Sequence, residues 1–284
     1  MGNFVSGSPT SDYLNFLISQ HQMTPIGLFT VFFLTLFRIA PIVSVSPFLG
    51  SKLPGGVKIA LAISLAVIFI PQIIQTSAQT EFSFNIDFLG YALKELLMGF
   101  ILGFLSAIPF YIAQGSGSLI DFMRGSSSLQ VTDPFMQTQT SSIGVLFNYV
   151  LIVVFFQIGG AFVFLDAVSE SFRVLPIDKM IPTGFFNLNL PFWKTIMGLL
   201  TRIFAISIQL AAPSIVSILM AEMFLGIANR LAPQVQIVFL GMSLKSLLGL
   251  GLLWAAWFFI LQQMAKQSLL WIKNIDDILV ALGM

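Results

Sequence analysis

The sequence predicts an all-α protein of the integral-membrane type, built from helical hairpins in which several helices are broken. Three observations predict this class: the composition, the lengths of the uncharged runs and the positions of the prolines. Of the 284 residues, 57% are hydrophobic and only 9% are charged. A water-soluble domain carries about 25% charged residues. Most of this surface is therefore expected to face lipid or an apolar partner.

The composition also excludes several classes of function. The 13 basic and 12 acidic residues nearly cancel, and no basic cluster occurs, so nucleic-acid binding has no support. Cysteine is absent and histidine occurs once, as His21, which leaves little for metal binding or acid–base chemistry. No HExxH, Walker or GxSxG motif is present. We therefore expect no enzymatic activity, no cofactor and no metal.

Six apolar segments reach or approach the length of about 20 helical residues that crosses a hydrocarbon core. They are Pro25–Leu49, Ile59–Thr80, Leu96–Ile120, Pro134–Leu165, Ile203–Ala221 and Ser246–Ala265. The first segment is split by Arg38. Each is predicted to be a helix or a helical hairpin, because none shows the period-two alternation of a membrane β-barrel.

The distribution of lysine and arginine leaves the membrane topology open. In a six-span arrangement one side would carry Lys94, Arg173, Lys179, Lys194, Lys266 and Lys273, and the other Lys52, Lys58, Arg124, Arg230 and Lys245. This near balance gives no orientation by the positive-inside rule. Either the number of spans differs from six, or the chain does not finally sit in the bilayer as an ordinary bundle.

Prolines interrupt or bound the apolar segments, and proline removes a helical hydrogen bond. The residues are Pro41, Pro47, Pro71, Pro109, Pro134, Pro213 and Pro233. Arg38-Ile-Ala-Pro41 and Arg230-Leu-Ala-Pro233 repeat one pattern, which predicts a cation beside a helix break at each corner. Broken helices at membrane depth favour a channel, a transporter or a subunit of an assembly.

Charges in or beside the apolar segments are candidates for function. A charge at membrane depth costs at least about 2.5 kcal/mol on insertion scales, so Arg38 and Glu222 are predicted to be functional or to pair between subunits. For Lys94, Glu95 and Lys245, snorkelling from a helix end remains the alternative. Other charges are predicted to be solvated in loops, namely Asp121, Arg124, Asp133, Asp166, Glu170, Arg173 and Asp178.

Small residues mark two further places in the chain. Gly99 and Gly103 are four residues apart, which predicts close approach of two helices. The stretch Ala113–Ser118, preceded by Phe110 and Tyr111, contains two glycines and two serines. It is predicted to form a turn, a re-entrant loop or a movable constriction, with a plain helix connection as the alternative.

Several of these motifs together resemble the FliR/SctT family, the export-gate proteins of flagella and type III secretion injectisomes. Phe37-Arg-Ile-Ala-Pro41, with Ser46-Pro-Phe-Leu-Gly50 and Leu53-Pro54, is similar to the opening of that family. Lys94-Glu95 with the two glycines, and then Asp133-Pro134, resemble its middle blocks. The closing block is carried by Glu222, Leu225-Gly226, Asn229-Arg-Leu-Ala-Pro-Gln234 and Leu240-Gly-Met-Ser-Leu-Lys245. The resemblance covers residues 25–265, and Ser243 stands where the family more often has proline.

The resemblance implies one export-gate domain over residues 1–284, with variable ends 1–24 and 266–284. It implies a multi-pass protein of the bacterial inner membrane, displaced toward the periplasm, that assembles with P-type and Q-type subunits. The U-type switch protein and the rod and needle proteins are further implied partners, and unfolded secreted proteins would pass through the gate. The residues of the motifs resemble the injectisome branch more than the flagellar one, and within it the proteins of chlamydia-like bacteria.

The resemblance also assigns residues. The loop that plugs the pore in the family corresponds to Phe110–Phe122 here, with candidate residues Phe110, Tyr111, Gly115, Ser116, Gly117 and Ser118. The candidate structural or inter-subunit charges and corners are Arg38, Pro41, Glu95, Glu222, Arg230, Pro233 and Lys245. A stand-alone secondary transporter, with Arg38 or Glu222 binding a substrate or a proton, is the alternative function.

Overall fold

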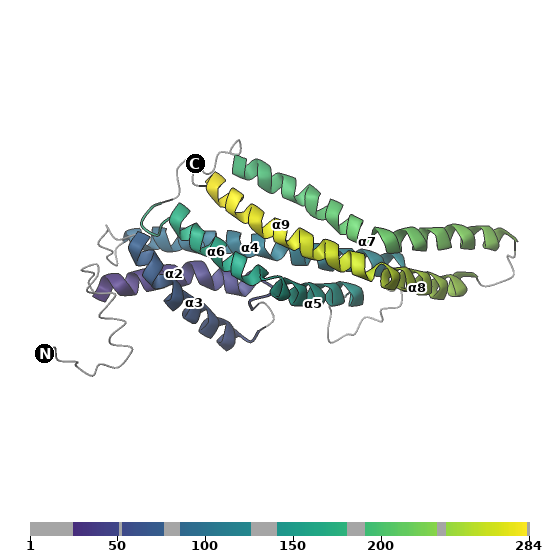
Figure 1. Cartoon of the computed structure of the whole chain (residues 1–284), viewed down its shortest axis with the longest axis horizontal. Helices are drawn as coiled ribbons and strands as arrows, with labels where there is room; N and C mark the ends of the chain where they lie inside the picture. Colours follow the sequence, from purple (N-terminus) through teal and green to yellow (C-terminus); the bar gives the residue numbers. More distant parts are fainter. Residues whose placement is uncertain are drawn as a thin grey trace. The chain divides into compact units, whose positions relative to one another are not determined.

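The computed structural model describes residues 25–50, 53–76, 86–125, 141–180, 191–231 and 237–282, and every regular element in these ranges is an α-helix (Figure 1). The helices are α2 (Pro25–Val45), α3 (Gly55–Thr76), α4 (Ile86–Met123), α5 (Ser142–Gln157), α6 (Gly160–Val174), α7 (Pro191–Leu231), α8 (Ile237–Ala255) and α9 (Trp257–Leu282). The predicted all-α class is confirmed. His21, Asp133, Pro134 and Pro233 lie outside the described residues.

The chain divides into two compact units. The first comprises residues 1–106, 164–190 and 275–284, and the second comprises residues 107–163 and 191–274. Helix α4 contributes to both, because the division falls between Ser106 and Ala107.

The first unit is built from α2, α3, the first half of α4 and most of α6. Aromatic rings pack edge to face between Phe48 and Phe164, with centroids 5.2 Å apart. Polar contacts also join the apolar helices: the buried hydroxyls of Ser46 and Ser106 are 2.6 Å apart, and Gln72 Nε2 donates to Ser169 Oγ at 2.5 Å. Interhelical hydrogen bonds between small polar side chains are typical of helices that pack in a membrane.

The second unit contains the rest of α4 with α5, α7, α8 and most of α9. Phe110 of α4 packs edge to face on Phe155 of α5, with centroids 5.5 Å apart. The guanidinium of Arg202 on α7 lies 5.4 Å from the ring centroid of Trp271 on α9. A Cβ atom on Gly249 of α8 would lie 2.9 Å from Ile218 of α7, so these two helices approach closely.

The six predicted apolar segments all appear as helices or bent helix pairs. By length and composition, four helices could cross a membrane: Ile26–Val45, Gly55–Thr76, Asp87–Met123 and Met197–Leu231. Two further candidates are bent pairs, in which α5 and α6 meet at 77° and α8 and α9 meet at 64°. The chain is therefore of the multi-pass membrane type with broken helices.

Four of the predicted prolines do not end a helix, whereas Pro47 follows the end of α2 at Val45 by two residues. Pro41, Pro71, Pro109 and Pro213 all lie inside helices, and α2 runs uninterrupted through Arg38. The prediction of a break at the Arg38–Pro41 corner is wrong, because a proline whose helix is packed by neighbours kinks it without ending it. The bend between α5 and α6 lies instead at Gly159, whose φ of 74° favours glycine. At the second corner α7 ends at Leu231, one residue beyond Arg230.

Candidate functional site

A buried cluster of three charges, Arg38, Lys94 and Glu95, lies inside the first unit. The side chains of Arg38 and Glu95 are completely buried, and that of Lys94 is 2% exposed. Arg38 donates from Nε to Glu95 Oε2 and from Nη2 to Glu95 Oε1, the latter at 2.9 Å. This bidentate geometry between α2 and α4 is the arrangement that the planar guanidinium favours.

The remaining donors of Arg38 reach the end of α6. Nη1 donates to the carbonyl oxygen of Ser171 at 2.9 Å, and Nη2 donates to that of Leu175 at 2.8 Å. The guanidinium carbon lies 4.1 Å from the ring centroid of Phe172. Arg38 is thus enclosed by groups of its own chain and offers no free donor to a substrate.

Lys94 completes the cluster from the other side of Glu95. Its Nζ lies 2.6 Å from Glu95 Oε1 and donates to the carbonyl oxygens of Pro176 at 2.8 Å and Lys179 at 3.0 Å. Two cations share one carboxylate, and the carbonyl groups at and beyond the C-terminus of α6 supply the remaining negative partial charge. The cluster therefore fixes the end of α6 to α2 and α4. Snorkelling is the wrong interpretation for Lys94 and Glu95, because both are buried.

The two glycines of α4 allow the cluster to form. A Cβ atom on Gly99 would collide with the backbone carbonyl of Arg38, and one on Gly103 would lie 3.2 Å from the Cα of Ile42. The prediction that Gly99 and Gly103 allow two helices to approach is confirmed, and the second helix is α2. Glu95 lies one turn before Gly99, so this contact also brings the carboxylate to Arg38.

The candidate plug segment is helical, so the predicted turn is wrong. Phe110–Phe122 lies within α4, which continues to Met123. Gly117 is needed there for packing, because a Cβ atom on it would lie 2.5 Å from Gly144 of α5, whereas one on Gly115 would make an ordinary contact at 3.5 Å from Ser207 of α7. Ser116 is buried and donates to the carbonyl of Ala113 at 2.8 Å, which satisfies its hydroxyl inside the helix.

A polar stripe runs along the outer face of the same segment. Tyr111, Gln114 and Ser118 are spaced three and four residues apart, so they share one helix face. Tyr111 and Gln114 are exposed, and Asn148 of α5 donates to Gln114 Oε1 at 3.3 Å. Asn148 was not among the residues that the sequence singled out, since a lone asparagine in an apolar run carries no local signal.

Asp121 was predicted to be solvated, and the structure contradicts this. Its side chain is buried at the end of α4 and accepts hydrogen bonds from Ser141 Oγ at 2.5 Å and Ile143 N at 3.0 Å. Arg124 donates to its other oxygen at 2.8 Å. A carboxylate at a helix N-terminus satisfies backbone N–H groups there, so Asp121 ties the end of α4 to the start of α5.

Glu222 and Lys245 form an ion pair between α7 and α8, with Nζ 2.5 Å from Oε1. Both side chains are partly exposed, at 41% and 24%. Among the described residues, no group of three or more histidine, cysteine, aspartate or glutamate side chains could hold a metal ion.

Comparison with known proteins agrees with this architecture of apolar, partly broken helices. The family model described as bacterial export proteins, family 1, matches residues 29–269. The chain belongs to this family. The predicted resemblance to the FliR/SctT proteins is thereby confirmed, and the components of this family belong to type III secretion and flagellar export apparatus.

Relatives from both kinds of apparatus match most of the chain. The secretion system apparatus protein SsaT of Salmonella typhimurium is 29% identical over 76% of this chain and 80% of its own length. The Yop proteins translocation protein T of Yersinia pestis is 29% identical over 70% of this chain and 75% of its own. The flagellar biosynthetic protein FliR of Aquifex aeolicus is 30% identical over 78% and 82%. These similar identities leave the injectisome branch, and its chlamydia-like form, as predictions.

Proposed function

We propose that this chain is a subunit of a type III protein export gate in the bacterial inner membrane. Together with P-type and Q-type subunits it would form the channel through which unfolded proteins leave the cell, with the U-type switch protein and the rod and needle proteins as further partners. In this proposal the whole chain acts as one export-gate domain of the injectisome branch and has no enzymatic activity. Its membership of the bacterial export proteins supports the general role.

One observation carries the assembly part of the proposal, namely a stripe of exposed apolar residues along the length of α7. Its residues are Met197, Leu200, Phe204, Ile208, Val216, Met220, Met223, Ile227 and Leu231, and each is more than half exposed. Spacings of three or four residues keep the four residues before Pro213 on one helix face and the five residues after it on another, so the stripe winds around α7. We call this set the α7 stripe.

The α7 stripe is too long for lipid alone to cover. From Met197 to Leu231 the helix rises about 50 Å at 1.5 Å per residue, whereas a hydrocarbon core is about 30 Å thick. Part of the stripe therefore lies beyond the lipid tails, where large apolar side chains require a protein partner. An apolar helix face of this kind fits the helices of small apolar subunits.

The polar stripe of Tyr111, Gln114 and Ser118, with Asn148, supplies the candidate channel wall. Exposed amide and hydroxyl groups in an otherwise apolar helix suit a water-filled passage and not a lipid-facing surface. We propose that this helical segment, with the neighbouring Phe110 and Gly115–Gly117, narrows the passage. The alternative of a stand-alone transporter is weakened because the donors of Arg38 are taken by its own chain.

The test is co-expression of the chain with its P-type and Q-type partners and isolation of the complex. The wild-type chain is expected to give a complex of fixed stoichiometry. Replacing both Met220 and Ile227 by glutamate places two charges on the α7 stripe and is expected to abolish the complex. The matched control replaces both residues by leucine, which keeps the stripe apolar and is expected to preserve the complex.

Failure of the wild-type chain to form such a complex, together with solute uptake by the chain alone in liposomes, would contradict the gate and favour the transporter. A glutamate double variant that still assembles normally would exclude the α7 stripe as the partner surface while leaving the rest of the proposal in place.

A further inference from the structure

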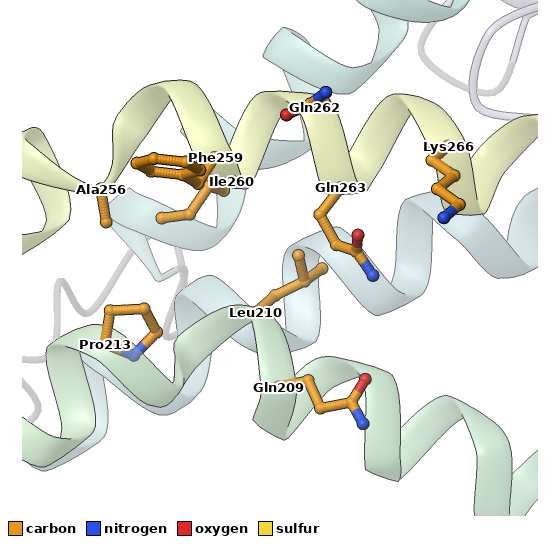
Figure 2. Close-up of a pocket in the computed structure, with 9 residues that line it drawn as sticks. All are labelled: Gln209, Leu210, Pro213, Ala256, Phe259, Ile260, Gln262, Gln263 and Lys266. Carbon is orange, nitrogen blue, oxygen red and sulfur yellow. The ribbon is translucent and has the colours of Figure 1, made fainter.

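The second unit contains a cavity of about 440 Å³ between α7 and the start of α9, which the gate function does not require (Figure 2). Its lining residues are Gln209, Leu210, Pro213, Ala256, Phe259, Ile260, Gln262, Gln263 and Lys266. The volume lies in the range of small-molecule sites, about 300–1,000 Å³. Both polar and apolar side chains line it.

The polar groups of the cavity include one ammonium group and amides that can donate hydrogen bonds. Gln209 on α7 and Gln263 on α9 each carry an amide NH₂, and Lys266 carries an ammonium group. Figure 2 shows Gln263 and Lys266 extending from α9 toward α7, whereas Gln262 points away. No acidic residue lines the cavity, and Lys266 has no ion pair within the described part of the chain. The cavity therefore suits a ligand with several acceptor oxygens and a negative charge.

Gln209, which lines the cavity, also has a backbone carbonyl that the helix does not use. Pro213 lies inside α7 and has no N–H, so the carbonyl of Gln209 lacks its usual donor four residues later. At membrane depth such a carbonyl needs another donor. A ligand hydroxyl group could supply one. A ligand that carries both an anionic group with several acceptor oxygens and a hydroxyl group is a phosphodiester with a polyol headgroup.

The apolar side of the cavity adjoins exposed aromatic side chains. Phe259 lines the cavity and is 70% exposed, and the adjacent Phe258 is equally exposed. A ligand whose polar end meets Gln263 and Lys266 can therefore lay an acyl chain against these rings. A cation and amides beside exposed aromatic rings match an amphiphile, and basic pockets between membrane helices are known sites for anionic lipid headgroups.

We propose that this cavity binds one anionic phospholipid, with its phosphate at Lys266 and Gln263 and an acyl chain along Phe259. The donors of Gln209, Gln263 and Lys266 favour a phosphate over the side chain of a partner helix, because a single carboxylate supplies only two acceptor atoms. The lipid would seal the bend at Ala256, where α8 and α9 meet at 64°.

The experiment places a photoreactive benzoylphenylalanine at position 259 of the full chain. The protein is reconstituted in vesicles of phosphatidylcholine with or without phosphatidylglycerol, irradiated and analysed by mass spectrometry. Phosphatidylglycerol adducts are expected to dominate over phosphatidylcholine adducts. The change Lys266→Gln is expected to reduce this preference about tenfold, the factor for one charge-assisted hydrogen bond.

Two controls fix the interpretation. Lys266→Arg keeps the charge and is expected to keep the preference, and Lys179→Gln, which removes an exposed lysine outside the cavity, is expected to change nothing. Equal labelling by the two lipids, or an unchanged preference in Lys266→Gln, would overturn the proposal. Irradiation in membranes that contain the partner subunits is expected to give lipid adducts, and adducts to polypeptide alone would assign the cavity to a partner.

Discussion

Arg38 is stable in an apolar interior because the groups around it use its donors. One carboxylate, two backbone carbonyls and an aromatic ring surround the guanidinium. Burying a charge without such partners costs several kcal/mol. Other carbonyls, those of Pro176 and Lys179 just beyond the end of α6, accept from Lys94. The cluster is therefore a fixed structural contact whose stability depends on its single anion, Glu95.

Replacing Glu95 by glutamine removes that anion and leaves two buried cations. Breaking a buried ion pair from one side costs about 3–5 kcal/mol, so Glu95→Gln is expected to lower the melting temperature of the purified chain strongly and to reduce its level in membranes. Thermal unfolding in detergent measures the effect.

The matched control for Glu95 is Glu170→Gln. Glu170 pairs with Arg173 at the surface, where the side chains are 39% and 66% exposed. Surface pairs contribute about 0–1 kcal/mol, so this control is expected to melt close to wild type. Equal melting temperatures for the two variants would show that the cluster does not stabilise the fold.

The sequence identified the residues of the cluster but could not pair them. Arg38 was marked by the cost of a charge in an apolar run and Glu95 by its place at the edge of one, yet 57 positions separate them. Their other partners are backbone carbonyls of residues 171, 175, 176 and 179, which no side-chain pattern reveals. Asp121 was misjudged for a related reason, because its partners are the hydroxyl and the backbone at the start of another helix.

At the scale of helices, glycine determines where two helices touch, and four prolines lie inside helices without ending them. Gly99 lies against the backbone of α2, and Gly117 lies against Gly144 of α5. Without a water-driven hydrophobic effect between membrane helices, association depends on close packing of this kind. An added methyl group at either position would push two helix backbones apart.

We expect Gly99→Ala and Gly117→Ala each to destabilise the protein by about 1–3 kcal/mol, the cost of overpacking an interior. Gly198→Ala on α7 is the matched control, because a Cβ atom there would meet nothing within 4 Å. Alanine is also the better helix former by about 1 kcal/mol, so the control is expected to melt at or above the wild-type temperature. The melting temperatures of the three variants, measured under one condition, test this prediction. A Gly117→Ala variant that melts above the wild type would contradict close packing of Gly117 on Gly144.

The location of the apolar helices could be predicted from hydrophobicity, but their ends and bends could not. Runs of apolar residues identified all six candidate spans. Four prolines, namely Pro41, Pro71, Pro109 and Pro213, were predicted to interrupt helices, but a packed helix tolerates a kink at proline. The glycines of Ala113–Ser118 suggested a turn for the opposite reason: residues that permit a turn are also the residues that permit two helices to touch.

At the scale of the whole molecule, two helices are much longer than a bilayer needs. Helix α4 has 38 residues and α7 has 41, which correspond to about 57 and 61 Å at 1.5 Å per residue. A tilt of up to about 40°, the upper end for membrane helices, does not fit either into a 30 Å core. Parts of both helices must therefore contact protein or water. This gives a physical reason why counting loop charges failed to orient the chain.

If the polar stripe on α4 lines a closed passage, changing its size is expected to change leakage. Replacing Tyr111 and Gln114 together by alanine removes the two largest exposed polar side chains of the stripe. The assembled gate is expected to admit small ions into liposomes at a higher rate than wild type, measured by a fluorescent ion indicator.

The control for leakage is Tyr149→Ala. Tyr149 is 52% exposed on α5 and follows Asn148 in the sequence. Because consecutive residues of a helix point about 100° apart, Tyr149 lies on a different face of α5 from Asn148. This variant is expected to remain as tight as wild type. A double variant that assembles and stays equally tight would contradict a channel wall at Tyr111 and Gln114.

The partners of Arg38 also set an order of events during synthesis. Its carboxylate lies 57 residues later in the chain, and its last carbonyl partner lies 137 residues later. When α2 leaves the ribosome, none of these partner groups has yet been made. Moving the unpaired guanidinium of Arg38 into lipid at that stage would cost at least about 2.5 kcal/mol. Helix α2 is thus expected to stay beside the insertion machinery, or in water, until α4 and α6 have been made. Helix α2 is therefore made before its partners but reaches its final position only after them.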